Sequence, residues 1–157
     1  MKKRYVNVET VLFHGRKNID WDEVENYLKR YLGKSYRVIE TQDVIKINTN
    51  SIDEFVSSRY TRKLKGTLAK AKANIALIIP ELIENATNRR WVQNNDEKHC
   101  NNASKGWFRY DAWFAFPVQA ENENEKRWNN YICTVIVNAN DNGMYLYDVI
   151  NIKKESE

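Results

Sequence analysis

Cysteine, proline and glycine are scarce in this sequence, whose 157 residues include two cysteines, two prolines and five glycines. Cys100 and Cys133 can pair in principle, but two cysteines form neither a disulfide framework nor the spacing of a zinc site. We therefore expect two free thiols and a reducing compartment. So few glycines leave little room for a glycine-rich phosphate loop, which excludes a nucleotide-hydrolysing motor.

Long apolar runs are missing as well. No segment approaches the ~20 consecutive apolar residues of a membrane-spanning helix. The basic N-terminus, Met1 to Arg4, continues into Tyr5-Val6-Asn7-Val8-Glu9 and not into an apolar stretch, so we expect no signal peptide. These absences predict a soluble, cytoplasmic protein without a membrane partner.

Apolar residues are nevertheless plentiful enough for a packed core. They make up 42% of the chain and include five Trp, nine Tyr and five Phe. The sequence shows no internal repeat and no domain linker. We predict a single domain over residues 1–157, with residues 1–5 and 153–157 frayed.

The N-terminal half carries the helical patterns. Apolar residues recur at helical spacing between Asp20, which can cap a helix, and Gly33, which can end it. A second, largely buried helix begins near Leu68, and Pro80 divides it into two segments that end near Ala86. The shorter elements expected are strands at 6–13, 36–39 and 44–47, a short helix or turn at 51–55, and irregular chain at 57–61.

The C-terminal half has the pattern of a sheet. Strands are expected at 107–118, 131–137 and 144–152, and a strong turn signal at 138–143 joins the last two into an antiparallel meander. Alternate residues of the first strand form a core face, namely Phe108, Tyr110, Ala112, Phe114, Phe116 and Val118. The opposite face, Trp107, Arg109, Asp111 and Trp113, is mixed, as expected of a sheet surface that binds a ligand. The predicted fold class is α+β, with N-terminal helices packed on an antiparallel β-sheet.

Positive charge is concentrated in one segment. No acidic residue occurs between Glu54 and Glu81, an interval that contains Arg59, Arg62, Lys63, Lys65, Lys70 and Lys72. Such a stretch can attract a polyanion such as nucleic acid. The alternative is that these side chains are simply solvated on a loop and a helix face.

The run from Lys98 to Asp111 places a histidine just ahead of a strand that carries arginine, tyrosine and tryptophan. These residue types suit the binding or cleavage of a phosphodiester. No metal-ligand spacing, phosphate loop or catalytic triad accompanies them, so we expect no metal and no other cofactor.

Five segments together resemble a family found in phages and conjugative elements of Gram-positive bacteria. They are Ser58-Arg59-Tyr60-Thr61 with Lys63 and Leu64, residues 69–74, Lys98-His99 through 106–111, residues 114–118, and residues 145–154. The sequence resembles the phage nuclease-like domains assigned to the barnase, EndoU, colicin and RelE (BECR) superfamily, over most of the chain from about Trp21. The resemblance implies an α+β domain and a toxin-like ribonuclease that cleaves RNA without a metal in the cytoplasm of a bacterial host.

Metal-free RNA cleavage needs a base for the ribose 2′-hydroxyl, an acid for the leaving oxygen, and donors that stabilise the charged phosphorane. Histidine suits the first two roles, and the chain contains only His14 and His99. We favour His99, because Arg109 and Tyr110 follow on a strand that can fold back beneath it. The alternative is that His99 is a surface loop residue or a structural hydrogen-bond partner.

The neighbouring side chains have alternatives of the same kind. Arg109 can hold a phosphate or pair with Asp111 or Asp148, and Tyr110 can donate to a phosphate, stack on a base, or lie in the core. Trp107 and Trp113 can stack on unpaired bases or merely cover the sheet. Tyr60 and Thr61, beside the basic residues, can grip an anion, although Thr61 can instead cap the following helix.

We therefore predict a mobile-element nuclease-like domain that acts on RNA, with a cleft where the sheet, the 93–105 loop and the basic segment meet. His99 would be the general acid or base, Arg109 would steady the phosphate, and Tyr60 or Thr61 would assist. Arg59, Arg62 and Lys63, helped by Lys65, Lys70, Lys72, Trp107 and Tyr110, would hold the nucleic acid. The alternatives are a non-catalytic phage accessory protein that binds a host protein or nucleic acid, for example to block a defence system, and a packaging or capsid-associated domain.

Overall fold

Strand β5 (Trp107–Val118) pairs with three other strands of the sheet. The computed structural model describes residues 3–15, 18–95, 99, 101–118 and 127–156. Within these residues seven strands form one sheet in the order β1-β5-β6-β7-β3-β2, and β4 pairs with β5 on the same edge as β1. The other strands are β1 (Tyr5–Asn7), β2 (Ser35–Arg37), β3 (Val44–Lys46), β4 (Thr87–Val92), β6 (Arg127–Asn140) and β7 (Gly143–Lys154).

The predicted antiparallel meander exists, but the sheet as a whole is mixed. Strands β5, β6 and β7 pair antiparallel in sequence order, as expected. Strand β1, however, runs parallel to β5, and β3 runs parallel to β7. Parallel neighbours need long crossover connections, and here the helices lie within those connections. The expectation of a purely antiparallel sheet was therefore wrong, while the α+β class is confirmed.

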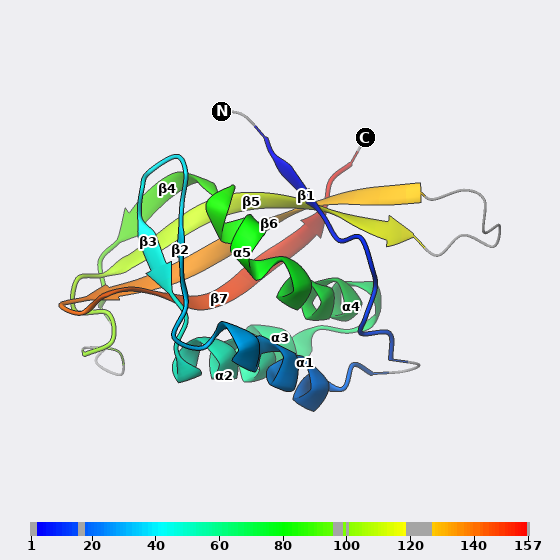
Figure 1. The fold of residues 1–157 in the computed structure, drawn as a ribbon, viewed down its shortest axis with the longest axis horizontal. Coiled ribbons are helices and arrows are strands. Elements are labelled where there is room, and N and C mark those ends of the chain that lie inside the picture. Colours follow the sequence, from blue (N-terminus) through cyan, green and yellow to red (C-terminus); the bar gives the residue numbers. More distant parts are fainter. Residues whose placement is uncertain (1–2, 16–17, 96–98, 100, 119–126, 157) are drawn as a thin grey trace.

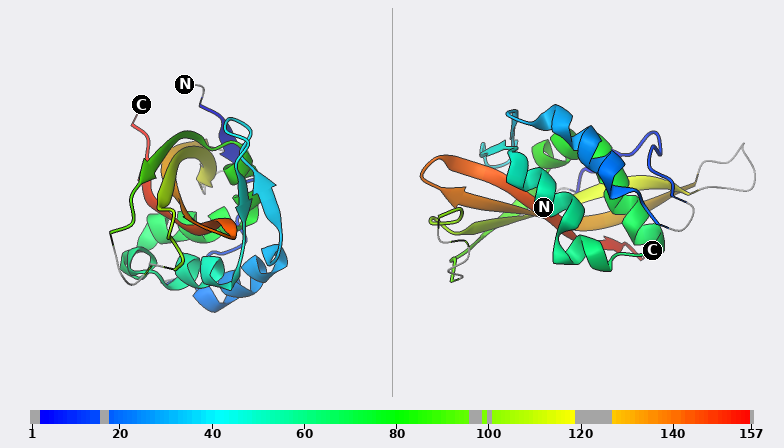
Figure 2. Two further views of the ribbon diagram at one scale, coloured as in Figure 1. Left: turned by 90° about the vertical axis from the view of Figure 1, so that its left-hand side faces the viewer. Right: turned by 90° about the horizontal axis from the view of Figure 1, so that it is seen from below.

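The helices pack on the sheet and enclose the core with it (Figure 1). They are α1 (Trp21–Leu28), α2 (Thr49–Ser57), α3 (Arg59–Lys63), α4 (Gly66–Ile75) and α5 (Ile79–Glu84), with single 3₁₀ turns at Lys29–Tyr31 and Ala76–Ile78. Figure 2 shows that the sheet curls and that α1, α2 and α3 lie side by side below it in the left-hand view. The buried face of β5 is the predicted one, with Tyr110, Ala112, Phe114 and Phe116 all in the core.

Local sequence explains most of the helix boundaries. Asp20 caps α1 by accepting hydrogen bonds from the amides of Asp22 and Glu23. Pro80 lies in the first turn of α5, where its missing amide hydrogen costs little, so the chain does form two helical segments there. The segment 57–61 was predicted to be irregular and is not, because the hydroxyl of Ser58 accepts from the amide of Thr61 and caps α3.

The N-terminal strand is much shorter than predicted. The strand ends at Asn7, and the last hydrogen bond to β5 is the one that the amide of Val8 donates to the carbonyl of Ala115 at 2.9 Å. Val8 and Phe13 are nevertheless buried. The buried side chain of Asn74 explains the difference, because its Oδ1 accepts from the amides of Leu12 and Phe13 and its Nδ2 donates to the carbonyl of Phe13. One asparagine thus substitutes for a partner strand. Its two donors and one acceptor satisfy backbone groups that would otherwise be buried without partners.

Described residues near both ends of the chain belong to the sheet. Tyr5 belongs to β1, while Lys153 and Lys154 belong to β7. Beyond β7, Glu155 accepts from Tyr5 and forms an ion pair with Lys3 at 3.1 Å. The two termini are thus tied to each other at the sheet. Residues 1, 2 and 157 lie outside the described residues.

Candidate functional site

A pocket of about 470 Å³ opens where the end of β4, His99 and one end of the β5-β6-β7 meander meet. Its walls include Asn94, His99, Trp107, Arg109, Ile136 and Tyr147, and we call it the His99 pocket. Gln93 and Asn95 add two further side-chain amides to its rim. The structure thus brings His99, Arg109 and Trp107 together around one pocket.

Three rings pack edge to face in the His99 pocket. The centroid of the His99 ring lies 5.3 Å from that of Trp107 and 5.5 Å from that of Tyr147. The rings of Trp107 and Tyr147 are 4.8 Å apart at an interplanar angle of 76°. Edge-to-face contacts at these distances are favourable and hold the rings in fixed orientations.

Tyr147 reaches this cluster through an irregularity in the sheet. Val137 of β6 pairs with Leu146 of β7, but the next residue, Ile136, pairs with Asp148, so Tyr147 is an extra residue on β7. Such a bulge redirects side chains locally. It lets Tyr147 line the pocket while Leu146 and Asp148 on either side of it are buried.

Hydrogen bonds hold the described parts of the loop against the strand. The indole Nε1 of Trp107 donates to Oδ1 of Asn94 at 3.3 Å, and Nδ2 of Asn94 donates to the carbonyl of His99 at 3.1 Å. Nδ1 of His99 is buried and has no hydrogen-bond partner within the described part of the chain. In a hydrolase triad, an aspartate orients the histidine by accepting a hydrogen bond from its Nδ1. No described Asp or Glu accepts such a bond from His99.

Gly106 sets the angle at which β5 begins. Its φ is +93°, a conformation that residues with a side chain rarely adopt. A Cβ at this position would lie 2.5 Å from Nε1 of Trp91 and 2.8 Å from the carbonyl oxygen of Val92. Glycine is thus required here, and it places Trp107 directly at the pocket.

Arg109 is half-buried and lines the pocket, and it forms no ion pair with any described Asp or Glu. The two aspartates predicted as alternatives are engaged elsewhere: Asp111 pairs with Arg90 at 2.9 Å, and Asp148 pairs with Lys72 at 2.6 Å. Those pairings of Arg109 were therefore wrong. Among the described residues that line the pocket there is no Asp or Glu, and Arg109 supplies a positive charge.

Tyr110 does not take part in this surface. It is fully buried, and its hydroxyl donates to Oδ2 of Asp43 at 2.6 Å. Burial and the hydrogen bond to Asp43 both raise the pKa of this phenol. The expectation that Tyr110 binds nucleic acid was wrong, because its strand alternation places it in the core. Trp113, only 2% exposed, is likewise not free to stack on a base.

Asp43 is the acceptor at the centre of a polar cluster with Thr41, Arg89 and Tyr110, which we call the Asp43 cluster. Burial by itself raises the pKa of Asp43, but hydrogen bonds from Thr41, Tyr110 and Arg89 outweigh it and hold the pKa below its usual value. Arg89 approaches both carboxylate oxygens, at 2.9 and 3.0 Å. The cluster ties the turn between β2 and β3 to β4 and β5.

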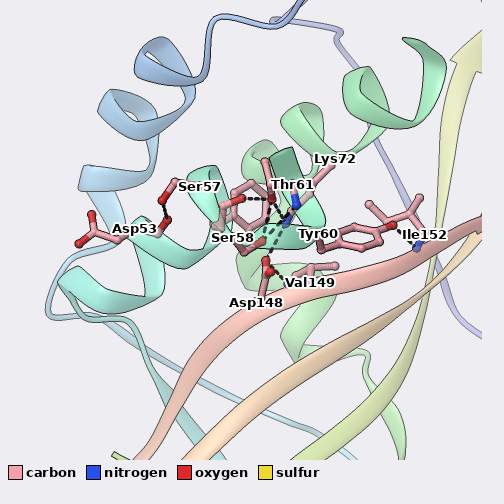
Figure 3. A network of polar contacts seen from close by, with 10 residues as sticks. Asp53, Ser57, Ser58, Tyr60, Thr61, Lys72, Asp148, Val149 and Ile152 are labelled. Carbon is pink, nitrogen blue, oxygen red and sulfur yellow. Dashed lines mark hydrogen bonds and ion pairs between the residues drawn. The ribbon is translucent and has the colours of Figure 1, made fainter. Parts of the chain in front are cut away.

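Lys72, predicted to bind nucleic acid, is fully buried (Figure 3). Its Nζ lies 2.6 Å from Oδ1 of Asp148 and also donates to the hydroxyl of Thr61. Burial lowers the pKa of this lysine, and the nearby Asp148 opposes that shift. The prediction for Lys72 was wrong because the helix turns this position toward the sheet, where a buried charge requires a partner.

Thr61 and Tyr60 belong to the same network and not to the His99 pocket. Thr61 is 1% exposed, and its hydroxyl donates to the carbonyl of Phe55 at 2.7 Å. The hydroxyl of Tyr60 accepts from the amide of Ile152 at 2.8 Å, and burial raises the pKa of the phenol (Figure 3). The expectation that either residue assists His99 was wrong, because neither lines its pocket. Thr61 does not cap α3 either, since Ser58 does.

The remaining basic residues are at the surface but away from His99. Arg59, Arg62, Lys63 and Lys65 are exposed, and Lys70 is half-buried. Arg62, Lys65 and Lys70 line a different pocket, which His14 also lines. The predicted single cleft was therefore wrong: the two pockets share no lining residue among those described.

Sequence reasoning missed Tyr147, Asn94 and Ile136 as pocket residues. Tyr147 was seen only as part of a strand, and nothing in a single sequence reveals the register shift that redirects it. Asn94 lies in the polar 93–105 loop, whose composition signals a loop but not which side chain turns inward.

Cys133 is a buried free thiol, as predicted, whereas Cys100 lies outside the described residues.

Two properties of the described residues bear on a membrane location and on metal binding. No helix among them has the length and apolar character needed to cross a membrane. No group of three or more His, Cys, Asp or Glu side chains in the same residues is arranged to hold a metal ion.

Comparison with known proteins gives one match. The model of the family described as "Large polyvalent protein-associated domain 3" matches residues 16–147. This range includes the basic segment, the described loop residues around His99, strands β2 to β6 and the start of β7, but not β1. No curated protein and no solved structure matches the chain.

Proposed function

We propose a function for this chain, which belongs to the large polyvalent protein-associated domain 3 family and is a phage-associated domain. In this proposal the domain binds single-stranded RNA in the His99 pocket and cleaves it without a metal. One observation carries the proposal. A histidine, an arginine that pairs with no described acidic residue, and two aromatic rings surround one pocket that no described carboxylate lines. The proposal includes membership of the BECR nuclease superfamily, which the sequence resembles.

The lining of the pocket is complementary to a nucleotide. Trp107 and Tyr147 offer aromatic surface for an unstacked base, and the amides of Gln93 and Asn95 can hydrogen-bond its edge. Arg109 can bind the phosphate through two parallel N–H donors. A volume of about 470 Å³ is within the range of small-ligand pockets.

The chemistry requires two proton transfers. In the proposed mechanism His99 accepts the proton of the ribose 2′-hydroxyl, and the 2′-oxygen forms a bond to phosphorus. The bond from phosphorus to the 5′-oxygen breaks, and Tyr147, whose ring centroid is 5.5 Å from that of His99, donates a proton to the leaving oxygen. The products are a 2′,3′-cyclic phosphate and a 5′-hydroxyl, while Arg109 stabilises the charge that develops on the phosphorane oxygens.

The test is cleavage of total cellular RNA by the purified protein in EDTA. His99→Ala is expected to reduce the rate by about 10²–10⁴-fold, the usual contribution of a general acid or base. Arg109→Ala is expected to weaken cleavage as well. Arg90→Ala is the matched control, because Arg90 pairs with Arg109 across the strands but its guanidinium is bound to Asp111 outside the pocket. Cleavage that survives in His99→Ala, or that falls equally in both arginine variants, contradicts the proposal.

A non-catalytic function is the second candidate, and one observation favours it. The described lining of the pocket holds a single imidazole and no carboxylate, which is a small set of groups for two proton transfers. The same surface would then serve a phage accessory protein that binds nucleic acid or a host protein, for example to inhibit a defence system. This candidate predicts RNA binding without turnover, tolerance of His99→Ala and loss of affinity in Arg109→Ala.

A further inference from the structure

A second pocket of about 430 Å³ lies between the segment that precedes α1 and the junction of α3 with α4. Its lining includes His14, Arg62, Lys65, Gly66, Thr67 and Lys70, and we call it the α3–α4 pocket. It shares no described residue with the His99 pocket, and no proposed chemical step involves it.

The α3–α4 pocket is strongly positive. Arg62 and Lys65 are exposed, and Lys70 is half-buried. Within the part of the chain that the structure describes, the side chains of these three residues form no ion pair and no hydrogen bond, and no Asp or Glu lines the pocket. Three unneutralised cations around one concavity raise the local concentration of anions.

Backbone donors contribute to the same pocket. Helix α4 is ten residues long and begins at Gly66, and its N-cap residue, Lys65, makes no side-chain capping hydrogen bond. Gly66 and Thr67, the first two residues of the helix, both line the pocket. The first amides of a helix have no partner within the helix and carry its positive dipole end, a combination that favours phosphate.

We propose that the α3–α4 pocket binds a phosphate group, held by Arg62, Lys65 and Lys70 together with the first amides of α4. This binding does not depend on cleavage at the His99 pocket. The phosphate belongs either to a nucleic-acid backbone or to a free phosphate ester, and both carry the same oxyanion.

Isothermal titration with inorganic phosphate at low ionic strength tests the proposal. In an Arg109→Ala background, which removes the cation of the His99 pocket, the protein is expected to bind phosphate at one site. Adding Arg62→Ala and Lys65→Ala to this background is expected to weaken the binding at least about tenfold, because each residue supplies a charge-assisted hydrogen bond. Lys63→Ala in the same background is the matched control, since Lys63 is exposed beside Arg62 but does not line the pocket. The side chains of Arg62, Lys63 and Lys65 are exposed, so their substitution is expected to leave the fold intact.

Two further arms identify the source of the phosphate and separate this site from the His99 pocket. Adding His99→Ala to the Arg109→Ala background is expected to leave phosphate binding unchanged. A short single-stranded RNA that competes with phosphate assigns the pocket to the nucleic-acid backbone, whereas competition by a nucleoside monophosphate alone assigns it to a free ester. Absence of phosphate binding, equal affinity with Arg62→Ala/Lys65→Ala and with Lys63→Ala, or loss of binding on adding His99→Ala overturns the proposal.

Discussion

Replacing Lys72 by methionine is expected to destabilise the fold strongly. Methionine has a similar length and no charge, so Lys72→Met keeps most of the packing and removes the cation that faces Asp148. Asp148 is 2% exposed and would be left as a buried carboxylate without its partner. The side chain would have to be protonated or hydrated, and either change costs free energy.

The magnitude follows from the burial of both partners. The side chains are 0% and 2% exposed, and the ion pair is 2.6 Å long. Removing one partner of a pair buried this deeply typically costs about 3–5 kcal/mol of the free energy of unfolding. Since domains of this size are stable by about 5–15 kcal/mol, the variant is expected to fold but to unfold at much lower urea concentration.

Removing both charges should reverse most of this loss. In the double variant Lys72→Met/Asp148→Leu no uncompensated charge remains, and such replacements are often neutral or stabilising. Urea denaturation followed by circular dichroism, on the wild type, both single variants and the double variant, gives the coupling energy directly. Single variants that each lose less than about 1 kcal/mol, or a double variant whose loss is the sum of the two, would refute the reasoning.

Three further predictions concern the Asp43 cluster, the start of β5 and the His99 pocket. The hydrogen bonds to Asp43 lower its pKa in the folded protein, so their stabilising contribution is complete above about pH 4 and is lost as the pH falls through the depressed pKa; thermal melts between pH 2 and pH 7 should show a shallower acid limb in Asp43→Asn, and an unchanged limb contradicts this. Gly106→Ala should cost about 1–3 kcal/mol because of its φ of +93° and the clash with β4, and more than Gly33→Ala, whose added Cβ meets nothing within 4 Å; equal urea midpoints for the two variants would argue against the clash. Trp107→Ala should weaken binding of a short RNA about tenfold through loss of one stacked base, as measured by fluorescence anisotropy, and unchanged affinity would remove Trp107 from the site.

The elements whose signals are local were predictable from the sequence. The cap at Asp20, the interruption at Pro80 and the alternation along β5 are set by residues a few positions apart, and all three are present. The mixed sheet was not predictable in this way. Whether β1 and β3 pair parallel with β5 and β7 is decided by how the helical connections pack across the whole domain.

Some features of the candidate site were likewise predictable from the sequence, and others were not. That His99 would lie near Arg109 and Trp107 follows from a short loop leading into one strand. The roles of Lys72 and Thr61 could not be read from charge or hydroxyl content, because burial decides them. Lys72 pairs with Asp148, which is 76 residues away in the chain, and also donates to the hydroxyl of Thr61. A basic residue in a helix with few acidic neighbours looks solvated until the strand that covers it is known.

The most direct measurement uses a DNA oligonucleotide that contains one ribonucleotide, incubated in EDTA with the wild-type protein and with His99→Ala. The account predicts cleavage by the wild type only after the ribonucleotide, with a 2′,3′-cyclic phosphate and a 5′-hydroxyl as the new ends, and none by the variant. Cleavage at deoxyribonucleotides, other end groups, or equal cleavage by His99→Ala would contradict the account.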